Sequence, residues 1–237
     1  MGQNPLAPAP LAGVDTVLLD AGGVLLVPNP AALRKVVAPY GIEISDESAR
    51  VAHYECMAEL DRLGALDWPR VDRHLARTIG VPEDCLDEVV DSIESMYLRE
   101  PWVPVDGAAE ALIRLQDAGF RLAVVSNASG TIEQQLLEGA ICSVDGGPMA
   151  RVEVVIDSHV VGVEKPDPAI FRLALDAIGA EPESCVYIGD TVYFDVNGAT
   201  AAGIGVVHAD PYDLCPGRAT GDHAHVSSLD ELSRALV

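Results

Sequence analysis

VLLDAGGVLL, residues 17–26, carries an apolar strand pattern directly into Asp20 and then into Gly22 and Gly23. A carboxylate at the end of a buried strand costs free energy unless a partner compensates its charge. The position of Asp20 therefore predicts a functional group at the carboxyl end of the first strand of a sheet.

Four further apolar runs resemble the first one. Several of the runs lack polar alternation, which is typical of parallel strands buried on both faces. Helical patterns separate them. One predicted helix begins at Asp167, which is followed by Pro168, and ends at Gly179. The alternation predicts an α/β fold with a parallel sheet. The predicted strands are TVLLD (16–20), RLAVVSN (121–127), VEVVIDS (152–158), CVYIGD (185–190) and IGVVHAD (204–210).

Residues 29–103 interrupt this alternation with helical segments alone, near 30–39, 46–63, 69–79 and 83–98. Proline-rich stretches flank this module on both sides. We therefore predict three parts: a loose N-terminal leader at 1–14, a core made of 15–28 and 104–237, and an all-helical insert at 29–103.

The charge of the chain limits its partners. It has 237 residues with 37 acidic and 15 basic side chains, a formal net charge of −22. Such a field repels nucleic acid and anionic membranes. An anionic substrate needs a local cation, and the only two lysines are Lys35 and Lys165.

Three features of the sequence bear on the expected localisation. No apolar run approaches the ~20 residues of a membrane span, and the start has no basic segment typical of a signal peptide. The five cysteines are odd in number and form no CxxC motif, which favours free thiols in a reducing compartment. We predict a cytoplasmic protein with no membrane partner.

Polar side chains follow the predicted strands at the edge where ligands bind in parallel sheets. Clustered carboxylates with room for water bind Mg²⁺. A lysine beside them can neutralise a phosphate, and Asp20 can act as nucleophile as well as ligand. The residues expected at this edge are Asp20, Ser126, Asn127, Lys165, Asp190 and Asp195.

The order of these motifs resembles the haloacid dehalogenase superfamily of hydrolases, from about residue 15 to the C-terminus. Asp20 falls on the nucleophile of that superfamily, Ser126 on its second motif and Lys165 on its third. GDTVYFD (189–195) falls on its acidic fourth motif. The insert at 29–103 resembles its helical cap.

The resemblance implies a Rossmann-like core and a hydrolase that acts on a small phosphorylated metabolite through an aspartyl-phosphate. Ser126 and Asn127 would bind the phosphoryl oxygens, and Lys165 would neutralise charge there. Mg²⁺ would be held by Asp20, the carbonyl of Gly22 and Asp190, with Asp195 supporting the metal site.

Gly22 departs from that pattern, because phosphatases of the superfamily carry a second Asp at this place. A positioned general acid or base contributes about 10²- to 10⁴-fold in rate. The favoured hypothesis is a phosphatase whose leaving group departs easily or takes its proton from elsewhere. His53, Tyr54 and His74 in the insert are possible donors.

Three alternatives stay open. A carbon–phosphorus hydrolase would use Lys35, the only lysine of the insert, to form a Schiff base. A carbon–halogen hydrolase needs no acid, but typically has Asn in place of Asp190. A non-catalytic protein could keep the phosphate and metal pocket.

DHAH (222–225) places two histidines beside Asp222 and ahead of a helix start. Because two ligands are too few for a metal site, this stretch is predicted to be surface structure.

Overall fold

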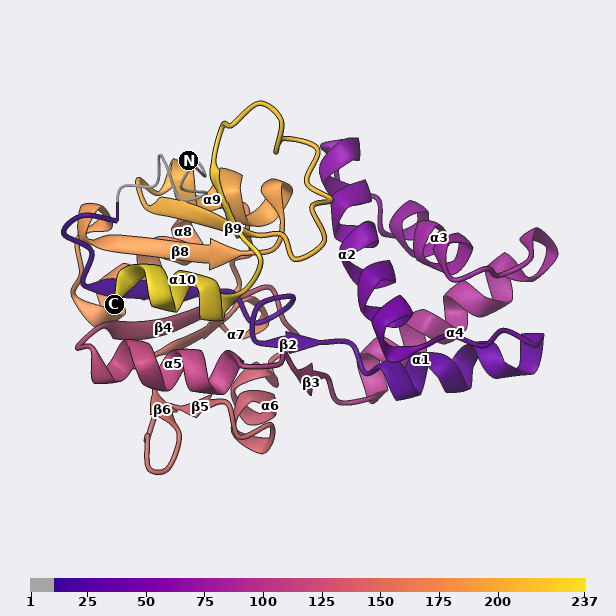
Figure 1. Ribbon diagram of the computed structural model, residues 1–237, viewed down its shortest axis with the longest axis horizontal. Coiled ribbons are helices and arrows are strands. Elements are labelled where there is room, and N and C mark those ends of the chain that lie inside the picture. Colours follow the sequence, from indigo (N-terminus) through magenta and orange to yellow (C-terminus); the bar gives the residue numbers. More distant parts are fainter. Residues whose placement is uncertain (1–10) are drawn as a thin grey trace. The chain divides into compact units, whose positions relative to one another are not determined.

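The computed structural model describes residues 11–237, which form two compact units (Figure 1). The sheet unit comprises residues 11–26 and Pro104–Val237, and the helical unit comprises Val27–Val103. The chain passes between them within β2 (Leu26–Val27) and β3 (Val103–Pro104), which pair with each other. Residues 1–10 of the predicted leader lie outside the described residues.

The sheet unit contains a parallel sheet of six strands, in the order β10–β9–β8–β1–β4–β7. All five predicted strands are present. Their bounds, with that of the sixth strand, are β1 Thr16–Leu19, β4 Arg121–Ser126, β7 Val155–Asp157, β8 Cys185–Gly189, β9 Gly205–Ala209 and β10 Ala224–Val226.

Strand β1 lies between β8 and β4, so Thr16 is paired with Cys185 on one side and with Arg121 on the other. Its four residues are fully buried, which explains why the strand carries no polar alternation. The N–H of Asp20 continues the ladder by donating to the carbonyl of Ile188 at 2.8 Å. Asp20 therefore leaves the sheet at the carboxyl end of its central strands.

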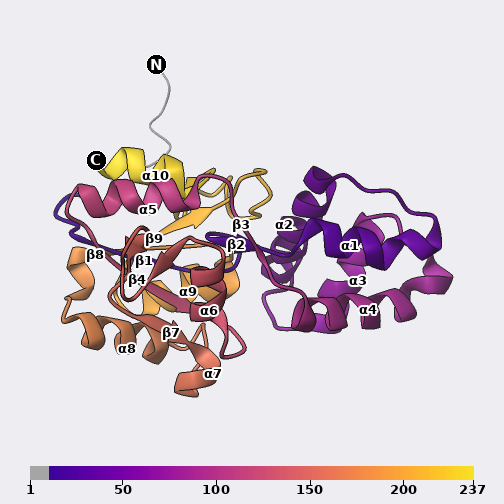
Figure 2. The same ribbon diagram turned by 90° about the horizontal axis from the view of Figure 1, so that it is seen from below.

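Helices cover both faces of the sheet (Figure 2). α5 (Ala108–Asp117) and α10 (Leu229–Leu236) lie on one face, with α8 (Pro168–Ile178) and α9 (Asn197–Ala201) on the other. The Asp167 side chain accepts a hydrogen bond from the N–H of Ala169, which confirms the predicted start of α8.

Shorter elements complete the sheet unit. They are α6 (Ile132–Glu138), α7 (Ser158–Val161) and the paired strands β5 (Cys142–Ser143) and β6 (Ala150–Arg151).

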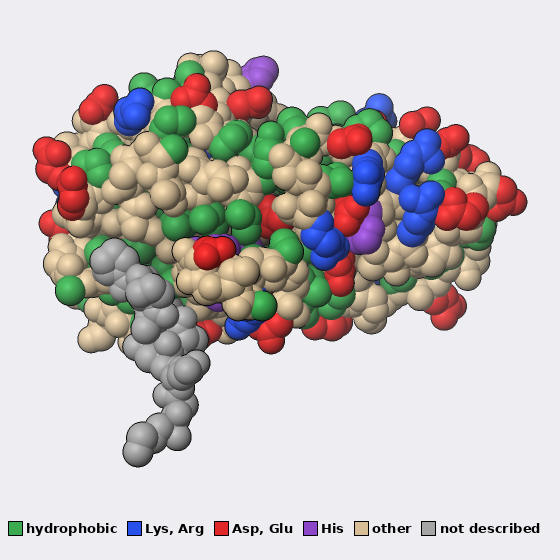
Figure 3. Space-filling view, turned by 90° about the horizontal axis from the view of Figure 1, so that it is seen from above, with side chains coloured by type: hydrophobic (Ala, Val, Ile, Leu, Met, Phe, Trp, Pro, Cys, Tyr) green, Lys and Arg blue, Asp and Glu red, His purple; other side chains and the backbone are tan. Residues whose placement is uncertain are grey.

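The helical unit consists of α1 (Pro30–Val37), α2 (Asp46–Leu63), α3 (Trp68–Thr78) and α4 (Leu86–Arg99), close to the four predicted segments. Acidic and basic side chains intermingle on the face of this unit that Figure 3 shows. Arg62, for example, bonds both Glu55 and Glu59.

None of the helices in residues 11–237 combines the length and the apolar character needed to span a bilayer.

The prediction for DHAH was wrong. Ala224–Val226 is the edge strand β10, which runs parallel to β9, and His225 is buried beside its register partner His208. A three-residue strand that contains a histidine lacks the apolar run that marked the other strands. Only the pairing with β9 reveals it.

Candidate active site at the strand ends

Asp20 lies directly after β1 and is almost completely buried. Its Oδ1 accepts a hydrogen bond from the N–H of Ala21 at 2.7 Å. The Lys165 Nζ lies 2.8 Å from its Oδ2. Both carboxylate oxygens are therefore oriented by donors, as a buried anion requires.

Lys165 is buried between two carboxylates. Its Nζ lies 2.8 Å from Asp195 Oδ1 as well as from Asp20, and 3.1 Å from the hydroxyl of Tyr187. Three acceptors thus surround the three N–H groups of one ammonium. The predicted local cation is in place next to Asp20.

Asp195 belongs to a π-helical turn, Val192–Val196, and four donors hold its carboxylate. Lys165 and the Tyr187 hydroxyl bond Oδ1, each at 2.8 Å, while the N–H and hydroxyl of Thr191 bond Oδ2 at 3.0 and 2.6 Å. Gly189 leaves room for it, because a Cβ at that position would overlap the Asp195 side chain. Asp195 is therefore fixed as the anchor of Lys165.

Asp190 follows β8 and is buried against the turn after β1. Gly23 has a φ of +66°, and a Cβ there would overlap the Asp190 carboxylate. Gly23 thus combines a left-handed turn with close contact to an acidic side chain, which only glycine permits without strain. This contact explains the second glycine of the opening motif.

Ser126 ends β4, the neighbour of β1, and its side chain is buried at the same edge of the sheet as Asp20. The Asn127 side chain lies beside the Lys165 backbone. Its Nδ2 donates to the Lys165 carbonyl at 3.0 Å, and its Oδ1 accepts from the Lys165 N–H at 2.7 Å. Asn127 thereby fixes the loop that carries the lysine.

Burial and charge act against each other in this cluster. Burial raises the pKa of Asp20 to about 6, although the Lys165 ammonium opposes the shift. Burial also disfavours the charged forms of Asp195 and Lys165, but their mutual attraction outweighs it, so the pKa of Asp195 falls and that of Lys165 rises. At neutral pH the site therefore holds charged carboxylates around one charged lysine.

The carboxylates suit a small divalent cation. One oxygen each from Asp20, Asp190 and Asp195 lies within 4.8 Å of the others. Two oxygens on opposite sides of Mg²⁺ would be about 4 Å apart, from metal–oxygen bonds of about 2.0–2.1 Å. Because Asp195 is held by four donors, Asp20 and Asp190 are the side chains that fit as direct ligands.

The sequence prediction missed three contacts of the site. Tyr187 and Thr191 hold Asp195, and His208 Nε2 lies 2.9 Å from the carbonyl oxygen of Asp190. Thr191 lies inside the GDTVYFD motif, which could have suggested it. Nothing in the strand patterns of Tyr187 and His208 separates them from packing residues.

The chain matches a known family over most of its length. A family model described as "haloacid dehalogenase-like hydrolase" matches residues 14–203. Haloacid dehalogenase-like hydrolase domain-containing protein 3 of Mus musculus is 31% identical over 174 residues, which cover 71% of this chain and 66% of that protein.

Two further relatives carry phosphatase names. Phosphoserine phosphatase of Thermus thermophilus is 34% identical over 118 residues, which cover 49% of this chain and 45% of that enzyme. Glyceraldehyde 3-phosphate phosphatase of Methanothermobacter thermautotrophicus is 28% identical over 218 residues, which cover 92% of this chain and 90% of that enzyme. The chain thus spans less than two thirds of the mouse and Thermus relatives, and most of the archaeal one.

Solved structures share the fold. The magnesium-bound putative hydrolase YfnB of Bacillus subtilis has a TM-score of 0.63 at 20% identity, covering 94% of this chain and 98% of that one. A crystal structure described as a dehalogenase has a TM-score of 0.62 at 22% identity, covering 94% of this chain and 97% of that one. At these identities the likeness concerns the fold alone.

Proposed function

Because this chain belongs to the haloacid dehalogenase-like hydrolase family, we propose that it is a Mg²⁺-dependent phosphatase acting on a small phosphorylated metabolite. The observation that carries the proposal is the buried pair of Asp20 and Lys165, whose charged atoms lie 2.8 Å apart beside Asp190. The phosphatase names of the relatives support the same reaction class.

Asp20 is the proposed nucleophile. Its carboxylate oxygen attacks phosphorus and the bond from phosphorus to the ester oxygen breaks. This leaves an aspartyl-phosphate and an alkoxide, which takes up one proton to become the free alcohol. Water then attacks this phosphorus, which releases inorganic phosphate and restores the carboxylate. The Ala21 N–H and Lys165 orient Asp20 before the attack.

The remaining residues position groups and stabilise charge. The Ser126 hydroxyl would bond a phosphoryl oxygen, and Lys165 would balance the charge that develops there. Asn127 and Asp195 hold Lys165 through its backbone and its ammonium. We assign both a positioning role. For Asn127 this role replaces the phosphate contact that the motifs implied, and for Asp195 it agrees with the expected support of the metal site.

Asp20, the Gly22 carbonyl and Asp190 are the proposed Mg²⁺ ligands. When bound, the cation would neutralise phosphoryl oxygens. His208 would position Asp190 through a hydrogen bond to the main-chain carbonyl of Asp190.

Gly22 sets the expected substrate preference. It has no side chain to protonate the leaving oxygen. Of the predicted alternative donors, His53 and Tyr54 are buried in contact with each other, with ring centroids 5.1 Å apart. We therefore expect leaving groups that depart with little help, such as aryl or acyl phosphates.

Two alternative reactions lack support at their key positions. Schiff-base chemistry requires an amine that desolvation or a neighbouring cation deprotonates, whereas Lys35 lies exposed on α1. The carbon–halogen alternative lacks the Asn that it expects at position 190.

The test is Mg²⁺-dependent phosphate release from esters graded by leaving-group pKa. We expect aryl and acyl phosphates to react far faster than alkyl phosphates, and Asp20→Asn to lower kcat by at least about 10³-fold. Asp117→Asn, an exposed aspartate on α5, is the matched control. Unchanged turnover in Asp20→Asn would refute the assignment of Asp20 as the nucleophile. Binding of phosphate and Mg²⁺ without turnover of any ester would instead support the non-catalytic alternative.

Gly22→Asp tests the missing acid separately. We expect it to raise alkyl phosphate hydrolysis, up to the ~10²-fold that a modest general acid supplies, while aryl phosphates change little. If both substrates respond equally, the leaving group is not protonated at position 22.

A further inference from the structure

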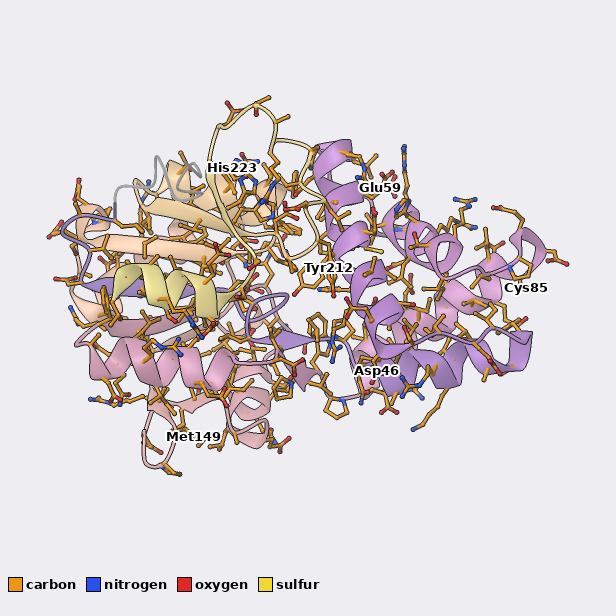
Figure 4. The ribbon with its side chains drawn as sticks, in the orientation of Figure 1. Asp46, Glu59, Cys85, Met149, Tyr212 and His223 are labelled. Carbon is orange, nitrogen blue, oxygen red and sulfur yellow. The ribbon has the colours of Figure 1, made fainter. Side chains whose placement is uncertain are left out.

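A second polar cluster lies in the sheet unit, behind Asp190. It consists of His208 at the end of β9, Cys215 and His223 in the following loop, and His225 on β10. One ligand atom from each of the four residues lies within 4.8 Å of the others. Three of the residues are buried and His223 is half-buried. Figure 4 labels His223 in this loop.

The sheet and the loop bring the cluster together from a chain segment of 18 residues. His208 and His225 are direct partners in the parallel register of β9 and β10. His223 lies in the loop directly before β10, and its Nε2 is 3.2 Å from His208 Nδ1. Centroid distances between the three rings are 4.4 to 5.3 Å.

The loop is shaped to present Cys215. Asp210 is buried, and its carboxylate accepts hydrogen bonds from the N–H of Leu214 at 2.7 Å and from that of Cys215 at 3.3 Å. Arg218 binds the same carboxylate at 3.0 Å. Gly217 packs against the cluster, since a Cβ there would lie 3.3 Å from the His223 ring and 3.7 Å from the Cys215 sulfur.

The distances between the ligand atoms match a tetrahedral metal. His208 Nδ1 lies 3.2 Å from His223 Nε2, and Cys215 Sγ lies 3.6 Å from the same nitrogen. At tetrahedral angles, zinc bonds of about 2.0 Å to nitrogen and about 2.3 Å to sulfur place two nitrogens about 3.3 Å apart, and nitrogen and sulfur about 3.5 Å apart. The side chains therefore need little movement to bind an ion.

Hydrogen bonding leaves the cluster with unused ligand capacity. His208 Nε2 faces the Asp190 carbonyl, which can only accept, so Nε2 carries the hydrogen and Nδ1 offers a lone pair to the cluster. A metal-bound histidine is typically held in this way by a backbone carbonyl. In addition, the Nε2 of His225 is buried without a hydrogen-bond partner, which is costly unless a ligand compensates it.

We propose that His208, Cys215, His223 and His225 form a closed four-ligand site for Zn²⁺. Three imidazoles and one thiolate are ligands of the type that zinc selects, in contrast to the all-oxygen site at Asp20 and Asp190. A closed set of protein ligands is typical of structural zinc. The ion would join the loop after β9 to the sheet and fix the His208 ring that supports Asp190.

The first experiment measures metal binding to the full-length, untagged chain after chelation and reloading with Zn²⁺ in the presence of excess Mg²⁺. We expect one zinc per chain. Loading with Co²⁺ in place of zinc should produce the charge-transfer absorption of a cobalt–thiolate bond. Wild-type protein that retains no zinc, or that binds Co²⁺ without the thiolate band, would overturn the proposal whether or not any variant folds.

Variants assign the ligands. Cys215→Ser combined with His223→Gln should lower the zinc affinity by more than about 10-fold, the least expected for disturbing a metal site, and should abolish the thiolate band. Cys85→Ser with His74→Gln, in the helical unit, is the matched control and should leave both unchanged. Asp190→Asn should retain the zinc, which separates this site from the carboxylates. Equal zinc affinity in the first double variant and the wild type would contradict the assignment.

Discussion

The two units of the molecule bury ionisable side chains in different ways. In the sheet unit, Lys165 lies 2.8 Å from both Asp20 and Asp195. In the helical unit, Asp72 is buried on α3, and the charge that acts on it is Glu94, of the same sign. Ion pairs hold their charges at neutral pH, whereas groups buried without an opposite charge shift toward their neutral forms. Opposite charges therefore stabilise the ionised groups of the sheet unit, whereas the buried carboxylate of the helical unit has no such compensation and is destabilising while it is charged.

Lys165→Met should produce the largest effect, because it removes the charge that balances the sheet unit. Breaking a buried ion pair by removing one partner costs about 3–5 kcal/mol of unfolding free energy. Chemical denaturation at pH 7 would measure it, with Lys35→Met, the exposed lysine of α1, as the matched control.

The same variant has a characteristic pH dependence. Without the ammonium, the pKa of Asp20 should rise above its value of about 6 in the wild type. The cost should therefore shrink as the pH falls from 7, because the unpaired carboxylates take up protons. A cost equal to that of Lys35→Met would show that the cluster does not depend on its cation.

The second prediction concerns His53 in the helical unit. Burial lowers its pKa from 6.5 to about 4. Between these values the unfolded chain binds a proton that the folded chain does not, so this residue lowers the unfolding free energy as the pH falls from 6.5 to 4. The full difference is about 3 kcal/mol.

Both tryptophans of the chain, Trp68 and Trp102, lie in the helical unit, so their fluorescence monitors its unfolding. His53→Gln should remove this loss of stability toward pH 4. The control is His74→Gln, which replaces a half-buried histidine and should show the same loss as the wild type. An identical pH slope in wild type and His53→Gln would show that His53 takes up its proton in the folded state.

Much of the fold and of the site could be predicted because each rests on local patterns. Apolar runs marked five of the six strands of the parallel sheet, and the polar residues after them marked the edge where Asp20, Ser126, Lys165 and Asp190 lie. Their roles remain predictions. The side-chain contacts around them could not be predicted from the sequence. Tyr187 has the pattern of an ordinary strand residue, and only the structure places its hydroxyl 2.8 Å from Asp195.

The histidine and cysteine cluster could not be predicted for a related reason. His208 and His225 are 17 positions apart and meet only through the register of β9 and β10. Cys215 joins them through a loop that Asp210 shapes. A pattern search along the chain finds residues that follow strands, but it does not find residues that a short edge strand brings together.

The smallest prediction addresses Asp72. Burial, together with the charge of Glu94, raises its pKa from 3.8 to about 6. At pH 7 the folded protein therefore holds a carboxylate that would be more favourable in the unfolded chain. Asp72→Asn should raise the unfolding free energy at pH 7 by on the order of 1 kcal/mol, less than the full pKa difference gives, because water reaches part of the group.

The gain from Asp72→Asn should have the opposite pH dependence to the effect of His53. As the pH falls from 6 to 3.8 the folded wild type gains a proton before the unfolded chain does, so the advantage of the variant should disappear over this range. Tryptophan fluorescence again measures it, and Asp91→Asn, an exposed aspartate of α4, is the matched control. A loss of stability at pH 7 would mean that the Asp72 charge is needed, and the helical unit would then resemble the sheet unit in how it treats buried charge.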